Sequence, residues 1–156
     1  MKTFPKPLKE RIYEAICILN NKFPNYDICI VGSSSLYLRD IDYKVPEDLD
    51  IVILNENLRE KSHYDYKHIV EYAAYKETGL YIDALGIKHG RFEYDVIDLF
   101  DKEVKVIKPE AYLEMKKKFS ENMQMSKKKR EKHKRSLTLL ENVINKIKTE
   151  NNGIKE

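Results

Sequence analysis

The chain has 156 residues and a mass of 18.5 kDa, which is the size of one ordinary domain. Its 29 Lys and Arg against 26 Asp and Glu leave a formal net charge of only +3, which excludes a histone-like polycation and an acidic disordered chain. Two cysteines cannot build a disulfide framework, and no window approaches eighteen apolar residues. We therefore expect one domain over residues 1–156, in the cytoplasm and without a membrane span.

The N-terminal third predicts two helices and two strands. Apolar residues recur at helical spacing over Pro7–Asn21, which predicts an amphipathic helix. The short β-branched run Asp27–Val31 is typical of a buried strand. A turn at Gly32–Ser35 leads into a short helix that ends at Leu38, and a second strand is expected over Asp48–Leu54.

The remaining elements predict an α+β fold. A helix is expected over 62–77, followed by strands over 80–88 and 91–100 that a hairpin turn at His89–Gly90 joins. A helix begins at Pro109, and the chain continues as lysine-rich helix to about Lys148. Residues 151–156 are expected to form a frayed tail. Together they predict a small mixed β-sheet with helices on one face. The core is expected over about 8–108 and a helical, basic C-terminal extension over about 109–150.

A glycine and a serine follow the first predicted strand. Gly32 lets backbone N–H groups approach a phosphate closely, and the Ser33 hydroxyl adds a donor. We therefore interpret Gly32, Ser33 and Ser34 as a candidate cradle for a triphosphate. The alternative is an ordinary strand-to-helix turn with a capping serine.

Two acids lie at the start of the second predicted strand. Asp48 and Asp50 are two residues apart, so their side chains point to one face, about 6.6 Å apart along the strand. Such carboxylates repel each other unless a cation lies between them, and hard oxygen ligands suit Mg²⁺. The alternative is a solvated rim of the sheet. A competing pair, Asp40 and Asp42, precedes the poor strand sequence Tyr43–Pro46 and is interpreted as a loop.

A third acid is expected on the strand over 91–100. Phe92, Tyr94 and Val96 alternate with polar residues and form its apolar face, which leaves Asp95 on the polar face. Asp95 is therefore the predicted partner of the first two acids. Asp98 is the alternative, and it needs a bulge or the strand end to join them.

Three segments in this order resemble the nucleotidyltransferase superfamily of DNA polymerase beta: Val31-Gly32-Ser33, Glu47–Ile53 with its Asp-Leu-Asp, and Tyr94-Asp95-Val96. The sequence is most similar to small bacterial and phage-type members, including toxins of abortive-infection systems. In those proteins a segment like Lys108–Lys116 follows the third acid and leads into basic helices. The resemblance covers about residues 28–135.

The resemblance implies transfer of an NMP group from an NTP, such as ATP, to an acceptor hydroxyl, with release of pyrophosphate. It implies Mg²⁺ or Mn²⁺ bound by Asp48, Asp50 and Asp95, with Asp98 as the alternative to Asp95, and a triphosphate held at Gly32 and Ser33. Asp95 would help to deprotonate the acceptor hydroxyl. Likeness to the toxins also implies a possible partner protein or antitoxin.

The C-terminal part is strongly basic. Residues 108–135 carry a net charge of +7, which leaves −4 for the rest of the chain, and the run 126–135 holds most of these cations. This run is a candidate surface for RNA such as tRNA, for DNA or for the triphosphate; the alternative is a solvated helix face. For the whole chain the alternatives to an enzyme are a degenerate module of the same fold that binds nucleic acid or a partner protein, and an α+β protein without catalysis.

Overall fold

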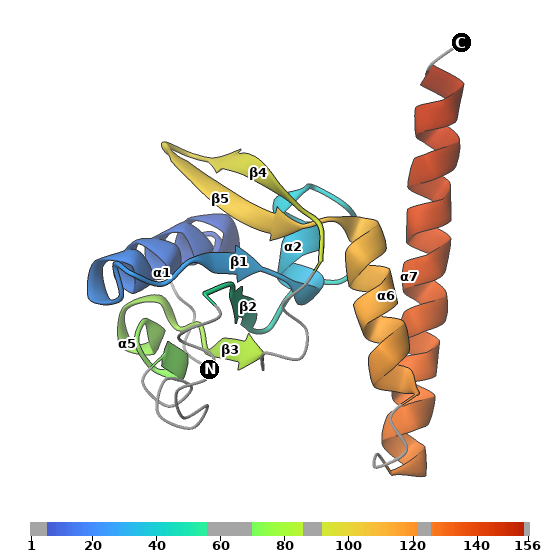
Figure 1. Ribbon diagram of the computed structural model, residues 1–156, viewed down its shortest axis with the longest axis horizontal. Coiled ribbons are helices and arrows are strands. Elements are labelled where there is room, and N and C mark those ends of the chain that lie inside the picture. The colour runs from blue at the N-terminus through green and yellow to red at the C-terminus, as the bar shows by residue number, and fades with distance from the viewer. Residues whose placement is uncertain (1–5, 56–69, 86–91, 122–125, 155–156) are drawn as a thin grey trace.

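The computed structural model describes residues 6–55, 70–85, 92–121 and 126–154, and its centre is a five-stranded mixed sheet (Figure 1). The strands are β1 (Ile28–Ile30), β2 (Leu49–Ile53), β3 (Ile82–Leu85), β4 (Tyr94–Leu99) and β5 (Lys102–Ile107), in the order β3-β2-β1-β5-β4. The pairs β1–β2 and β4–β5 are antiparallel, whereas β1–β5 and β2–β3 are parallel.

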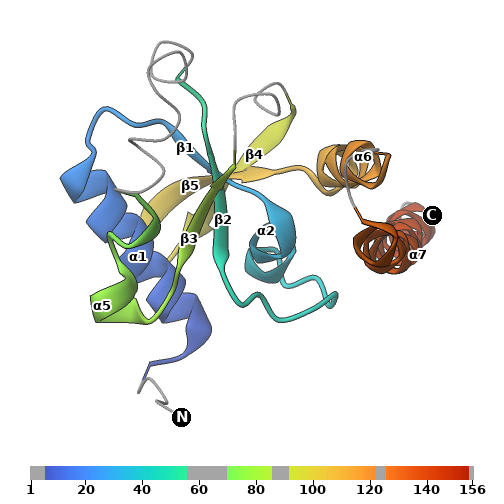
Figure 2. The same cartoon turned by 90° about the horizontal axis from the view of Figure 1, so that it is seen from below.

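Helices cover both faces of this sheet. The described helices are α1 (Leu8–Lys22), α2 (Gly32–Leu38), α5 (Tyr75–Thr78), α6 (Pro109–Ser120) and α7 (Lys127–Ile154). Figure 2 shows α1 and α5 on one side of the sheet and α2, α6 and α7 on the other. The predicted α+β class, mixed sheet and helical C-terminal extension are confirmed, but the prediction of helices on one face is wrong.

The central strands are buried on both sides because alternate side chains enter two different hydrophobic clusters. Ile30 and Ile51 pack toward α1, whereas Val31 and Val52 pack in the cluster that α6 and α7 complete. All four are at most 1 % exposed. Double burial explains why β1 and β2 are nearly continuous apolar runs, and why an acid within such a run is unusual.

The second half of the predicted sheet is paired differently from the expectation. The strands expected to form one hairpin, β3 and β4, lie at opposite edges of the sheet. The hairpin is instead β4–β5, joined at Phe100 and Asp101, and β5 was not predicted. The reason is long-range, because β5 inserts beside β1 in parallel, which no local turn signal encodes.

Two helix boundaries also differ from the expectation. Residues 62–69 of the helix expected over 62–77 lie outside the described residues, and the described remainder is interrupted at 72–74 before α5 begins. Helix α7 continues to Ile154, so the tail predicted from residue 151 is wrong within the described part. None of the helices in the described ranges is long and apolar enough to cross a membrane.

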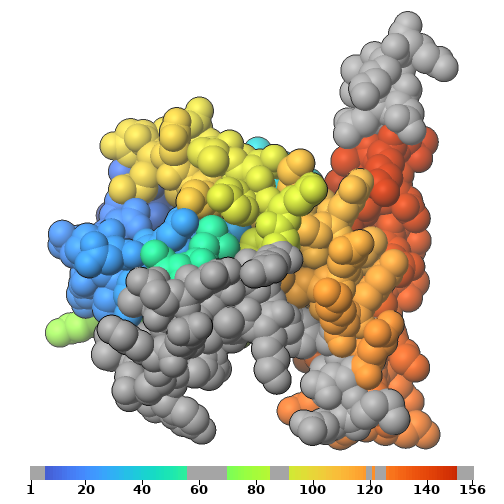
Figure 3. Space-filling view, viewed as in Figure 1, coloured from blue at the N-terminus to red at the C-terminus, as the bar shows by residue number. Residues whose placement is uncertain are grey.

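Helices α6 and α7 form an antiparallel pair beside the sheet. Ion pairs link Lys117 to Glu141 at 3.8 Å and Glu110 to Lys148 at 3.2 Å. Leu140 of α7 is fully buried in the cluster on this face. Figure 3 shows the pair as a ridge along one side of the molecule, with α7 extending beyond α6. This ridge faces the end of β2 that carries the predicted acids.

Candidate active site

Gly32 joins the two motifs that the sequence singled out. It follows β1 with a left-handed φ of +67°, and a Cβ atom built on it would lie 2.1 Å from Oδ2 of Asp50 and 3.0 Å from its Cβ. The Val31 N–H donates to the Asp50 carbonyl at 2.9 Å, which fixes β2 beside the turn. Glycine is therefore required for the Asp50 carboxylate to lie against this backbone.

Two of the three serines after Gly32 hold the turn together. The Ser34 hydroxyl donates to the Asp48 carbonyl at 2.8 Å, and the Ser35 hydroxyl donates to the Gly32 carbonyl at 2.6 Å. Both serines are fully buried, whereas Ser33 is 9 % exposed. Ser34 thus positions the start of β2, and Ser33 is the least buried of the three serines.

Asp50 has a partner acid that the sequence analysis missed. In the parallel pair β2–β3, Asp50 stands in register with Asp83, so both side chains point to the face that α6 covers. The available signal was a single acid between Ile82 and Ala84, the same pattern as Asp50 in its own strand. The expected pairing of β3 with β4 would place Asp83 away from Asp50, so the sequence pattern alone did not indicate that the two acids are neighbours.

The charges of Lys44 and Lys116 compensate only part of the repulsion and burial that act on Asp50. Burial, followed by repulsion from Asp83 and from Asp48, raises the pKa of Asp50 to about 7. The pKa of Asp48, which is exposed at the rim, is also raised, by burial and by the charges of Asp83 and Glu47. Carboxylates gathered in this way favour either a proton or a cation between them.

Asp50 and Asp83 are carboxylates, the hard oxygen ligands that Mg²⁺ uses in proteins. Among the described residues, no three Asp, Glu, His or Cys side chains are close enough to hold a metal ion by themselves. Mg²⁺, however, commonly binds through one or two carboxylates and takes its other ligands from water and substrate phosphates. Asp50 and Asp83 supply two such carboxylates on adjacent strands.

The prediction that Asp95 lies beside Asp48 and Asp50 is wrong. The register runs across the sheet from Asp95 through Val106 and Ile30 to Ile51. Residues in one such row point to one face, so Asp95 has the orientation of Ile51, opposite to that of Asp50. Two strands, β5 and β1, also lie between β4 and β2.

The reason is that the buried face of β4 is the one that carries Asp95, whereas the sequence analysis expected the face of Tyr94 and Val96 to be buried. Ile97 and Leu99, which lie on the same face of β4 as Asp95, pack in the α1-side core, whereas Tyr94 and Val96 on the other face are 38 % and 56 % exposed. As an edge strand, β4 leaves the apolar residues of its other face in solvent. Alternation alone showed that β4 has two faces, but not which face is covered.

Asp95 has a structural partner instead. Nη2 of Arg39 donates to the Asp95 carboxylate at 2.9 Å and to the carbonyls of Val106 and Ile107 at 3.2 and 3.1 Å. Lys108 lies 3.9 Å from the same carboxylate. Asp95 therefore helps to anchor the segment after α2 to the end of β5.

The remaining candidate acids lie elsewhere. Asp98 stands opposite Glu103, level with the end of β2 that is remote from Asp50. Asp40 has a φ of 60° in the loop after α2, and its carboxylate lies 3.7 Å from Lys9 of α1. The interpretation of Asp40 and Asp42 as loop residues is confirmed, because no described strand contains them.

A cavity of about 280 Å³ opens over the acidic pair. Its lining residues are Gly32, Asp50, Asp83, Tyr112, Met115, Lys116 and His133. Helix α6 thus contributes an aromatic ring, a thioether and an ammonium group, and α7 contributes an imidazole. None of these four side chains was predicted from the sequence to belong to the site. The cavity has the size and the mixed lining of a small-molecule site.

Comparisons with known proteins bear on the fold. No protein-family model and no curated protein sequence matches the chain. Among solved structures, an antigenic nucleotidyltransferase-like protein from Paracoccidioides brasiliensis superimposes with a TM-score of 0.50 at 13 % identity, covering 85 % of this chain and 75 % of that one. The chain has a nucleotidyltransferase-like fold. At this identity the likeness concerns the fold alone.

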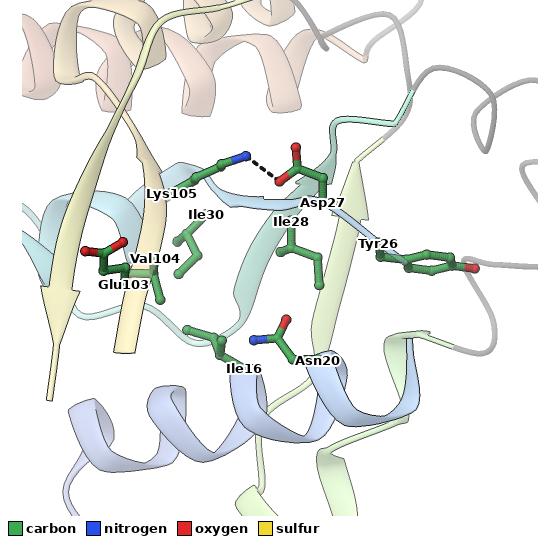
Figure 4. Close-up of a pocket in the computed structure, with 9 residues that line it drawn as sticks. All are labelled: Ile16, Asn20, Tyr26, Asp27, Ile28, Ile30, Glu103, Val104 and Lys105. Carbon is green, nitrogen blue, oxygen red and sulfur yellow. Dashed lines mark hydrogen bonds and ion pairs between the residues drawn. The ribbon is translucent and has the colours of Figure 1, made fainter. Parts of the chain in front are cut away.

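A second cavity of this nucleotidyltransferase-like fold lacks the same features. It measures about 160 Å³ and lies between α1 and the opposite end of β1 (Figure 4). Its one close pair of opposite charges, Asp27 and Lys105, is neutralised by direct contact at 2.6 Å. No described residue forms such an ion pair with Asp50 or Asp83, and we therefore take the cavity over these two acids as the candidate site.

Proposed function

We propose that this chain is a metal-dependent nucleotidyltransferase that moves an NMP group from an NTP to an acceptor hydroxyl. The observation that carries the proposal is the register of Asp50 with Asp83 directly against the Gly32 turn, at the base of a cavity of about 280 Å³. In this proposal Asp83 takes the part that the sequence analysis gave to Asp95. The nucleotidyltransferase-like fold supports the reaction class.

The proposed roles follow from where each group lies. Asp50 and Asp83 would hold the metal ions at the cavity base, and Asp48 at the exposed rim would add a nearby negative charge. When bound, Mg²⁺ or Mn²⁺ supplies positive charge to the phosphates and makes the acceptor hydroxyl more acidic. The Gly32 turn and the Ser33 hydroxyl bind phosphate oxygens, while Ser34 keeps Asp48 in place.

The transfer itself is a substitution at the α-phosphorus. The acceptor oxygen forms a new bond to this phosphorus, and the bond to the bridging oxygen of the β-phosphate breaks, so that pyrophosphate leaves with the electron pair. The hydroxyl proton passes to a carboxylate of the acidic group, for which Asp48 at the rim is the most accessible. Catalysis then depends on positioning and on charge neutralisation.

The test is incorporation of label from each α-labelled NTP into separate RNA, protein and metabolite fractions of a cell extract, with Mg²⁺ or Mn²⁺. We expect transfer by the wild-type chain and loss of at least 100-fold with Asp50→Asn or Asp83→Asn. The matched control is Asp95→Asn, which removes the same charge from a carboxylate on the other face of the sheet. Equal activity of Asp83→Asn and Asp95→Asn would refute the assignment.

The acceptor we favour is a nucleic acid, because of the surface of α7. Six of its Lys and Arg side chains between residues 127 and 135 are exposed, and His133 of the same segment lines the cavity. A strand bound along this segment ends near the acids. If it contacts about five phosphates, its affinity falls on the order of 100-fold between roughly 50 and 200 mM salt.

Binding to RNA and to DNA oligonucleotides across this salt range tests the surface separately from the chemistry. Steep salt dependence that Asp50→Asn retains, together with absence of transfer by the wild type, would identify a degenerate binding module of the same fold. Binding that is insensitive to salt would remove α7 from consideration as a phosphate-contacting surface.

A further inference from the structure

Lys116 is a buried cation that makes no ion pair with the described residues. Its side chain lines the cavity, and the residue is only 9 % exposed. Its ammonium group lies 5.9 Å from the centroid of the Tyr112 ring, and the described residues form no hydrogen bond with it. An unpaired buried charge is costly to the fold, so this position calls for an explanation.

Other cations lie near Lys116 on neighbouring elements. His133 of α7 lines the cavity with Lys116. Lys44, an exposed residue of the loop between α2 and β2, is not a lining residue, but its charge acts on Lys116. Burial and Lys44 lower the pKa of Lys116 to about 8, although Asp50 opposes this effect. The pKa of His133 is lowered by burial, then by Lys116 and by three further lysines, Lys132, Lys44 and Lys129. Each cation therefore destabilises the charge of the next.

The two walls of the cavity carry opposite charges, and the residues that the structure describes form no ion pair between them. Asp50 and Asp83 lie on the sheet wall, and Lys116 with His133 lies on the helical wall. Direct pairing of the walls would neutralise both, as it does for Asp27 and Lys105 elsewhere in this fold. This arrangement is complemented by a ligand that carries metal ions at the end facing the carboxylates and several negative charges at the end facing Lys116 and His133.

We propose that Lys116, together with Lys44 and His133, forms a binding site for the terminal phosphates of a nucleoside polyphosphate. The identification of the ligand rests on the proposed nucleotidyl transfer, but the anion site itself does not. Lys116 contacts the β- and γ-phosphates across the cavity from the carboxylates, and the α-phosphate lies between the two walls. The helical extension is then part of the nucleotide site, and α6 is needed for binding even when no acceptor is present.

The experiment is calorimetric titration with inorganic tripolyphosphate, ATP and AMP in the presence of EDTA. We expect tripolyphosphate and ATP to bind the wild type, and Lys116→Gln to weaken both by at least 10-fold while affinity for AMP changes less than 2-fold. The matched control is Lys118→Gln, two residues further along α6, where the side chain is exposed. Because Lys116→Gln removes an unpaired buried charge, its melting temperature should equal or exceed that of the wild type, and this shows that the variant is folded.

Three results would overturn the site: no binding of tripolyphosphate to the wild type, an equal loss with Lys118→Gln, or a parallel loss of AMP. The first removes the anion site, the second reduces it to the general charge of α6, and the third moves Lys116 away from the terminal phosphates. Failure of the transfer reaction is separate. Tripolyphosphate binding that depends on Lys116, without label transfer to any fraction, supports the site and refutes only the catalytic proposal.

Discussion

Replacement of Asp50 by asparagine should stabilise the protein at alkaline pH. The pKa of this carboxyl is raised from 3.8 to about 7, chiefly by burial and then by repulsion from Asp83. A difference of about three units corresponds to about 4 kcal/mol, at 1.36 kcal/mol for each unit. Small movements of the cavity wall and entry of water reduce this penalty, so we expect a gain of about 2–4 kcal/mol.

The sign follows from proton binding. Between about pH 4 and pH 7 the folded chain keeps a proton on Asp50 that the unfolded chain has released, so stability falls as the pH rises through this window. Above about pH 7 the folded state carries a buried, repelled charge. The introduced asparagine has no such charge, so Asp50→Asn should gain stability over the wild type progressively from about pH 4 to about pH 8.

Urea unfolding followed by far-ultraviolet circular dichroism, at several pH values in this window, measures the difference. At about pH 8, Mg²⁺ should stabilise the wild type and leave Asp50→Asn almost unchanged, because the metal needs the ionised carboxylate. A variant that is less stable than the wild type at pH 8 would show that a contact stabilises the carboxylate. Equal stabilisation of both chains by Mg²⁺ would show that the ion binds elsewhere.

Three further predictions test the framework of the site. Gly32→Ala should lower the free energy of unfolding by at least about 2 kcal/mol and abolish transfer, because alanine disfavours the left-handed φ and its Cβ clashes with the Asp50 carboxylate. Gly79→Ala, at a φ of +72°, should lower it by only about 1–2 kcal/mol and keep the activity. Urea unfolding and label transfer compare the two variants. Arg39→Ala should lower the free energy of unfolding by about 2–3 kcal/mol, because it leaves the carbonyls of Val106 and Ile107 without their hydrogen-bond donor. Asp95→Asn should lower it by less than about 1 kcal/mol, because that carboxylate is 44 % exposed. A reversed order of the two losses in urea unfolding would contradict this account. Leu140→Ala should cost about 2–5 kcal/mol in urea unfolding, and a loss below about 1 kcal/mol would show that α7 is not packed on the body.

Sequence reasoning predicted the parts of the candidate site that depend only on short-range geometry. Gly32 and the strand of Asp48 and Asp50 were recognised because a turn glycine and a two-residue spacing on one strand need no knowledge of distant neighbours. The structure then supplied the reason for the glycine, which is the carboxylate that fills the place of its side chain. Local motifs therefore gave the centre of the site.

The third acid could not be assigned in this way because it depends on strand order. Asp83 and Asp95 both lie within strands, and the alternation of each is compatible with either face. The outcome was decided by β3 pairing with β2 and by β5 inserting between β1 and β4. Both are pairings between segments far apart in the chain, and the hairpin signal at residues 89 and 90 pointed to a different one.

The position of Lys116 and His133 in the cavity is harder still to predict from the sequence. It is also the strongest argument that the cavity binds a ligand. Lys116 belongs to a run of three lysines, and nothing local distinguishes it from Lys118, which is exposed. A chain under constraint only to fold would place such a group in solvent or pair it with Asp50. Buried and half-buried charges of opposite sign line this cavity without forming an ion pair among the described residues. Such charges cost stability and are best explained by a ligand that pairs with both walls.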